Sequence, residues 1–163
     1  MKKIIFILSM LCFAWSNTNA QSLYKTVRDK ANKVVNDLSA NQDNRDVNQF
    51  KIMALNYLVA QVSKRGLNKD GLFYDSQAVS MTSFVDDCFA YVLQAGKVSA
   101  AKKKQVLDCY KNASLACPMF NDPDKKSTQL YLKKENTITP FSLDTDWDKA
   151  YDKVCKDIRA IIR

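Results

Sequence analysis

The stretch of sequence that decides the fold spans residues 50–62 and reads FKIMALNYLVAQV. Its apolar side chains recur at helical spacing on two sides, with Phe50, Met53, Ala54, Tyr57 and Leu58 on one side and Ile52, Leu55, Val59 and Val62 on the other. A helix that is apolar on more than one face is covered by its neighbours in a folded protein. We therefore expect a central helix that begins with a capping pattern at Asp46 and Gln49 and ends near Gly66.

Helical spacing continues on both sides of this stretch. Residues 22–39 carry the apolar stripe of an amphipathic helix. A third helix is expected to begin near Asp75 or Ser76 and to end at Gly96. A fourth is expected from the capping residue Ser99 to a stop before Pro118.

The helical pattern breaks down between residues 118 and 144, where residues 130–132 and 137–139 form a possible short hairpin. A capping box at Thr145 and Asp148 then predicts a last helix that runs to the C-terminus. The sequence thus predicts an all-α fold: a compact bundle of about five helices, with a short irregular or hairpin segment before the last one.

The first twenty residues have the pattern of a cleavable export signal. Lys2 and Lys3 supply the positive start, residues 4–14 are apolar, and Thr18 and Ala20 place small residues at the −3 and −1 positions of a cleavage site. The apolar run is shorter than the roughly 18 to 20 residues that cross a bilayer. We expect a signal peptide over residues 1–20, a single helical domain over residues 21–163 with no membrane span, and a location in the periplasm or outside the cell.

Four cysteines remain after cleavage: Cys88, Cys109, Cys117 and Cys155. An even number of cysteines in an exported chain indicates two disulfides, because the compartments beyond the inner membrane are oxidising. Three pairings are possible, and an antiparallel arrangement of the third and fourth helices favours Cys88 with Cys109 and Cys117 with Cys155. No close pair of cysteines is present, which argues against a zinc site and a thiol oxidoreductase.

The chain contains no histidine. This absence removes the histidine-dependent nucleophile arrangements and histidine acid-base catalysis. Carboxylate chemistry stays open, but the adjacent Asp86 and Asp87 do not face each other on a helix. The alternating Asp144, Asp146 and Asp148, and the loop at residues 66–77, imitate a calcium loop without its final glutamate. We assign no catalytic residue, no metal ligand and no cofactor.

Removal of the two leader lysines lowers the net charge of the chain from +8 to +6. The lysines are scattered and greatly outnumber the arginines, which favours hydrated charge over nucleic-acid recognition. Four apolar residues in the expected loops are candidate interface residues: Phe73, Tyr74, Met119 and Phe120.

Three hypotheses of function follow. The leading one is an exported, non-catalytic helical protein that binds another protein in the envelope or outside the cell, in an accessory, inhibitory or immunity-like role. The second is an aspartate-dependent hydrolase of the cell envelope or of polysaccharides. The third is a carrier of a small apolar ligand inside the bundle, suggested by the apolar breadth of residues 50–62.

The mature protein is expected to begin at Gln21, because cleavage after Ala20 satisfies the small-residue rule of the export signal. Mass spectrometry of the protein isolated from its producing cell checks this. A mature protein that retains Met1 would contradict the export hypothesis.

Overall fold

The structure is a computed structural model of the chain, and it describes residues 22–93, 99–122 and 139–162. Its helices are α2 (Leu23–Asn36), α3 (Gln42–Lys64), α4 (Gly71–Leu93), α5 (Ala100–Ala116) and α7 (Trp147–Ile162). The described part of the chain has no strand, so the predicted all-α bundle is confirmed there. The predicted hairpin lies outside the described residues except for Thr139, which is not in a strand.

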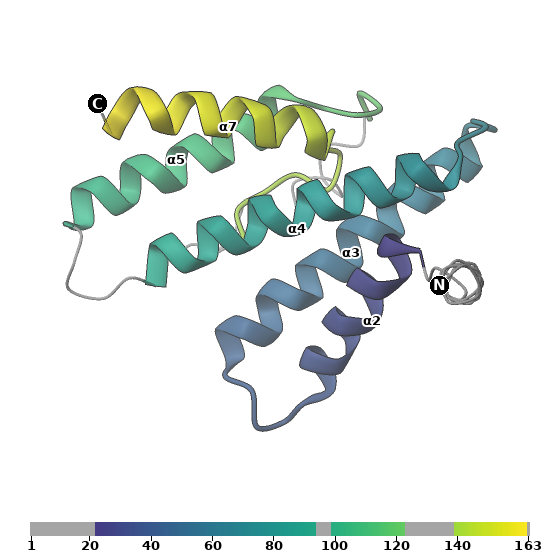
Figure 1. The fold of residues 1–163 in the computed structure, drawn as a ribbon, viewed down its shortest axis with the longest axis horizontal. Helices are drawn as coiled ribbons and strands as arrows, with labels where there is room; N and C mark the ends of the chain where they lie inside the picture. Colours follow the sequence, from purple (N-terminus) through teal and green to yellow (C-terminus); the bar gives the residue numbers. More distant parts are fainter. Residues whose placement is uncertain (1–21, 94–98, 123–138, 163) are drawn as a thin grey trace, which may run out of the picture.

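Helix α4 occupies the centre of the bundle. It packs against each of the other four helices, whereas α3 packs against α2 and α4 (Figure 1). The helix expected to be central was the one at residues 50–62, which is part of α3. Helix α4 takes that place because its side chains Ala78, Met81, Phe84, Val85 and Cys88 are all buried, and because it runs alongside α7 and antiparallel to α5 (Figure 1).

Aromatic rings fill the space between these helices. The ring of Phe84 lies 4.9 Å from that of Tyr110, 5.2 Å from that of Phe141 and 5.5 Å from that of Trp147, each measured between centroids and each edge to face. Phe50 of α3 adds edge contacts to Phe141 and Trp147. Edge-to-face packing is the favoured geometry for such rings. The cluster therefore joins α3, α4, α5 and α7 in one core.

The start of α3 differs from the sequence prediction. The helix begins at Gln42, because the side chain of Asn41 accepts a hydrogen bond from the backbone N–H of Asn44 at 2.8 Å. The expected cap, Asp46, is instead an exposed residue within the helix and accepts a bond from the Gln42 side chain. An asparagine is as good a cap as an aspartate, so the earlier residue prevails.

The start of α4 also differs. The carboxylate of Asp70 accepts a hydrogen bond from the N–H of Phe73 at 2.9 Å, and the helix begins at Gly71 rather than near Asp75. The start of α5 is as predicted, with Ser99 as its cap and Lys102 as the donor. The earlier start of α4 places Phe73 and Tyr74 on a helix instead of in a loop.

The four cysteines are free thiols in the structure. Cys88 is fully buried, and its burial raises the pKa of the thiol to about 12. Cys109, Cys117 and Cys155 are partly exposed. The predicted Cys88–Cys109 and Cys117–Cys155 disulfides are therefore not formed.

Cys117 is too far from the other three cysteines for any disulfide. Its carbonyl accepts the N–H of Asp146 at 2.7 Å, whereas Cys155 lies nine residues farther along α7, about 13 Å at the helical rise. Cys109 lies eight residues back on the same helix, about 12 Å away. A disulfide needs Cα atoms within about 7 Å of each other.

Cys88 is also remote from Cys117. The ring contact between Phe84 and Tyr110 sets these two residues at one level of the antiparallel helices α4 and α5. Cys88 and Cys117 lie on opposite sides of this level, about 16 Å apart along the helix axes. Two disulfides would have to include Cys117, so the predicted pair of bridges is not seen in this fold.

We expect Cys117 to keep a free thiol even in protein isolated from an oxidising compartment. Maleimide labelling in denaturant without a reductant, followed by peptide mapping, measures this, and a Cys117→Ser variant identifies the labelled peptide. An intrachain disulfide that contains Cys117 would contradict the helix register described above.

Candidate functional site

A buried non-helical segment, residues 139–146, leads directly into α7. Every residue from 139 to 147 is buried. Loops normally run over the surface, because a buried one must find partners for its backbone N–H and C=O groups. The side chains that provide these partners form the densest polar network in the described part of the chain, and we treat this network as the candidate site.

Hydroxyl groups provide one set of partners. The Ser114 hydroxyl of α5 accepts the backbone N–H of Ser142 at 2.9 Å and lies 2.8 Å from the hydroxyl of Thr145. The Thr145 hydroxyl donates in turn to the carbonyl of Ser142 at 2.7 Å. Ser114 and Thr145 are both at most 2% exposed. These bonds fix the segment against α5.

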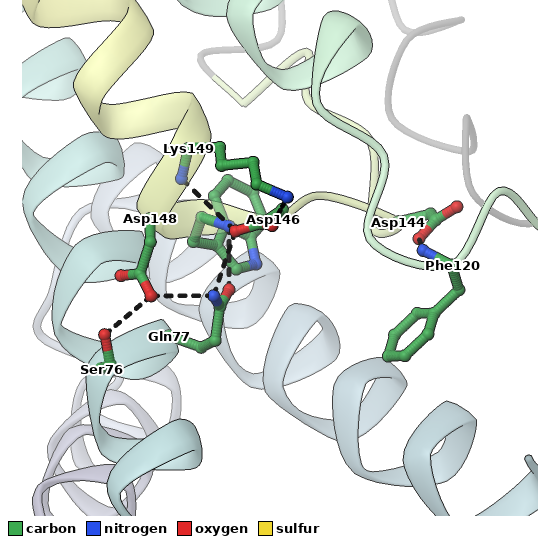
Figure 2. A network of polar contacts seen from close by, with 8 residues as sticks. Ser76, Gln77, Phe120, Asp144, Asp146, Asp148 and Lys149 are labelled. Carbon is green, nitrogen blue, oxygen red and sulfur yellow. Dashed lines mark hydrogen bonds and ion pairs between the residues drawn. The ribbon is translucent and has the colours of Figure 1, made fainter. Parts of the chain in front are cut away.

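The Asp144 carboxylate, within the segment, pairs backbone groups of the turn after α5. Its two oxygens accept the backbone N–H groups of Phe120 and Asp122, both at 2.8 Å; the bond to Phe120 is drawn in Figure 2. Between the two donors, Asn121 adopts a positive φ of 49°, a conformation that asparagine tolerates. The turn after α5 is thus held by the Asp144 carboxylate, which accepts two of its backbone N–H groups.

Asp122 extends this turn to α3. Its carboxylate accepts the hydroxyl of Tyr57 at 2.7 Å and the side-chain amide of Gln61 at 3.1 Å. Partial burial and this hydrogen bond to a carboxylate raise the pKa of the Tyr57 hydroxyl well above its usual value of 10. The phenol therefore acts as a hydrogen-bond donor that holds the turn against α3.

Gln77 of α4 provides a second set of partners and is 3% exposed. Its carbonyl oxygen accepts the N–H of Trp147 at 2.8 Å. Its amide donates to Asp146 at 3.2 Å and to Asp148 at 3.0 Å. Figure 2 shows Gln77 between the two carboxylates, so one amide group joins α4 to the first turn of α7.

The two carboxylates have further partners. Asp148 also accepts the hydroxyls of Ser76, at 2.7 Å, and Ser80. Asp146 accepts the backbone N–H of Lys149 at 3.3 Å and is the cap of α7, in place of the predicted box of Thr145 and Asp148. The ammonium of Lys149 lies 2.9 Å from Asp146, and this hydrogen-bonded ion pair raises the pKa of the lysine.

The three aspartates that imitate a calcium loop all accept hydrogen bonds. Asp144 accepts them from backbone N–H groups, Asp146 from an amide and a backbone N–H, and Asp148 from hydroxyls and an amide. No cluster of three or more histidine, cysteine or acidic residues suited to a metal is found within the described residues. The other loop that imitates a calcium site, residues 66–77, ends in Gln77 at the centre of the network.

The four predicted interface residues are partly buried and packed. Phe73 lies under the ammonium of Lys69 and against Tyr74, while Tyr74 also contacts the ring of Tyr24. Phe120 packs on Tyr57 and lies under the Arg65 guanidinium, and Met119 is half-buried beside it in sequence. The structure does not bring the four together in one cluster.

Other apolar side chains are more exposed than these four. Their exposed fractions are 77% for Leu72, 52% for Leu23, and 42% for both Leu67 and Val79. Sequence reasoning missed Leu23 and Val79 because apolar residues at helical spacing fit a core. It passed over Leu67 and Leu72 in the expected loop in favour of the aromatic residues Phe73 and Tyr74. One signal was available. The polar residues Ser76 and Ser80 face α7 in the structure, so the apolar residues Leu72 and Val79 on another side of α4 are turned outward.

Within the described residues, the fold and the network define a bundle of five helices in which α7 is joined to α4 by a buried amide and carboxylates. Comparison of the chain with protein-family models, with curated proteins and with solved structures finds no match in any of the three. Within the described residues, no helix is both long enough and apolar enough to cross a membrane.

Replacement of Gln77 by leucine is expected to lower the free energy of unfolding by about 3 kcal/mol, because it leaves the buried Trp147 N–H without an acceptor and removes one donor from each of two carboxylates. Urea unfolding followed by circular dichroism measures the change. The matched control is Gln105→Leu on the exposed side of α5, with an expected change within about 0.5 kcal/mol. Equal effects of the two substitutions would show that the amide does not join α4 to α7.

Proposed function

We propose that the chain is an exported, non-catalytic helical protein that acts by binding another protein, in an accessory, inhibitory or immunity-like role in the periplasm or outside the cell. The export pattern of residues 1–20 supports the location. The observation that carries the binding role is an exposed apolar surface where α2 and α4 meet. We call it the Asp75 face.

The Asp75 face is built around a fixed carboxylate. Asp75 of α4 accepts the hydroxyl of Ser22 at 2.6 Å and the backbone N–H of Tyr24 at 2.8 Å. These bonds lower the pKa of Asp75, and they cap α2, whose own capping residue makes no side-chain bond to the helix. The start of α2 is therefore held beside the start of α4.

Three exposed apolar residues surround this carboxylate. Leu23 lies between the two residues bonded to Asp75, while Leu72 and Val79 precede and follow it at helical spacing on α4. A helix presents residues three and four apart on one side, so Leu72 and Val79 lie on the same side as Asp75. Exposed apolar clusters on a folded domain mark interaction surfaces more often than isolated exposed residues do.

The polar network supports a role without catalysis. Its aspartates are engaged in holding the buried segment, and its serines donate to them. A partner protein is a fitting ligand for the Asp75 face, because both helices of the face are held in place before binding and little ordering would oppose association.

The test is capture by the immobilised protein, purified without residues 1–20, from envelope and secreted fractions. A Leu23→Asp/Val79→Asp variant is expected to capture at least tenfold less of the partner protein, since its charges would be buried in the contact. The control is Leu38→Asp, at an 85% exposed leucine in the connection between α2 and α3. Capture of the same proteins in equal amounts by all three forms would contradict the proposal.

A further inference from the structure

The turn between α3 and α4 is the most continuously exposed part of the described chain. All ten residues from 63 to 72 are exposed, and the turn projects at an outer end of the bundle (Figure 1). We call these residues the α3–α4 tip. Its convex, outward position distinguishes it from the Asp75 face, which lies along the helices.

The tip has a fixed backbone. The N–H of Leu67 donates to the carbonyl of Val62 at 3.0 Å, and the N–H of Gly66 donates to that of Ser63 at 3.0 Å. Gly66 has a positive φ of 61°. This conformation and the two hydrogen bonds form a Schellman motif at the end of α3. The next helix, α4, begins at Gly71, directly after Asp70, whose carboxylate accepts the N–H of Phe73. The tip is therefore a short, internally bonded turn and not a free loop.

The side chains of the tip combine apolar and positive groups. Leu67 is 42% exposed and Leu72 is 77% exposed. Lys64, Arg65 and Lys69 lie between and beside them in the sequence. The single acid of the tip, Asp70, already accepts the N–H of Phe73. The exposed leucines are thus surrounded by an excess of positive charge.

We propose that the α3–α4 tip binds the surface of a bilayer that contains anionic lipids. Leu67 and Leu72 enter the boundary between headgroups and acyl chains, and the lysines contact the lipid phosphates. Exposed leucines beside lysines and arginines are the combination that interfacial binding uses, with apolar burial and electrostatic attraction added together. A protruding turn with ten exposed residues can reach a bilayer surface, where negatively charged headgroups lie next to apolar acyl chains.

This surface goes beyond the proposed binding of a protein. Leu72 belongs to both surfaces, so the experiments on the tip leave it unchanged. The two proposals fail separately, because one depends on Val79 and Leu23 and the other on Leu67, Lys64 and Lys69.

The first experiment measures partition of the full chain onto vesicles of phosphatidylcholine with 30% phosphatidylglycerol, at about 0.05 M salt. The variant Lys64→Gln/Lys69→Gln is expected to bind about 25-fold more weakly, at about fivefold per lysine near an anionic surface. The control, Lys30→Gln/Lys33→Gln on α2, removes the same charge away from the tip and is expected to retain most of the binding. Residues 1–20 are identical in all forms, so a difference between two forms comes from the substituted lysines.

Two outcomes of this experiment would overturn the proposal. One is a ratio within twofold for the tip variant, and the other is equal losses for the tip variant and the control. The proposal also predicts a salt effect. At high salt, the difference in binding between the tip variant and the unchanged chain is expected to disappear, because exposed charges are then screened.

A second measurement reports on the tip directly. In a Trp15→Phe background the other tryptophan, Trp147, is buried, so a Leu67→Trp variant places a separate reporter at the tip. Brominated lipids in the anionic vesicles are expected to quench its fluorescence and shift its emission to shorter wavelength. The same reporter at Leu38 is the control. A reporter at residue 67 that is no more quenched than the one at residue 38 would show that the tip points at solvent or at a protein, and the membrane proposal would fail.

Discussion

Burial of the irregular segment at residues 139–146 is the constraint on which the rest of the structure depends. A helix pairs its own backbone groups, but a buried non-helical segment has to obtain its partners from elsewhere in the chain. Here the Ser114 hydroxyl of α5 accepts the N–H of Ser142, and the carbonyl of Cys117 at the end of α5 accepts that of Asp146. The side chain of Gln77 on α4 accepts the N–H of Trp147, directly after the segment. The partners lie on α4 and α5, so burial of the segment depends on both helices being in place.

This requirement explains how the helices are arranged. The ring of Phe141, within the segment, packs on Phe50 and Phe84 and joins α3 to α4. Gln77 and Asp148 then attach the first turn of α7 to α4, while the Asp146 N–H bonded to Cys117 attaches it to the end of α5. The same bond separates Cys117 from Cys155 and accounts for the failure of the predicted disulfide. The aspartates that imitate a metal loop in the sequence are used for this attachment.

The distribution of polar and apolar groups separates stability from function. Carboxylates and hydroxyls are buried at the junction of α4, α5 and α7, whereas Leu23, Leu67 and Leu72 are exposed at the starts of α2 and α4 and in the turn after α3. Burial of a leucine side chain contributes about 1.5 to 3 kcal/mol, so exposure of several leucines forgoes stability that a core could have used. We infer that these leucines are selected for contacts with other molecules, which is the basis of both proposed surfaces.

The sequence predicted the elements better than their junctions. Apolar periodicity was sufficient for five helices, and Ser99 was correctly identified as a cap, because both signals are local. The starts of α3 and α4 were misplaced because two capping residues competed at each site and the earlier one, Asn41 or Asp70, was used. The role of Gln77 depends on residues some seventy positions away, and no local pattern contains that information. The exposure of Leu23 was missed for the same reason: exposure depends on which neighbouring helices cover a face.

The measurement that tests the central claim most directly is native-state hydrogen exchange at the amides of Ser142 and Trp147. If the buried segment holds the bundle together, both amides exchange only through global unfolding, with the same opening free energy as the amide of Val85 in the middle of α4. Exchange through an opening several kcal/mol easier than that of Val85 would show that the segment detaches while the helices stay packed, and would contradict the account.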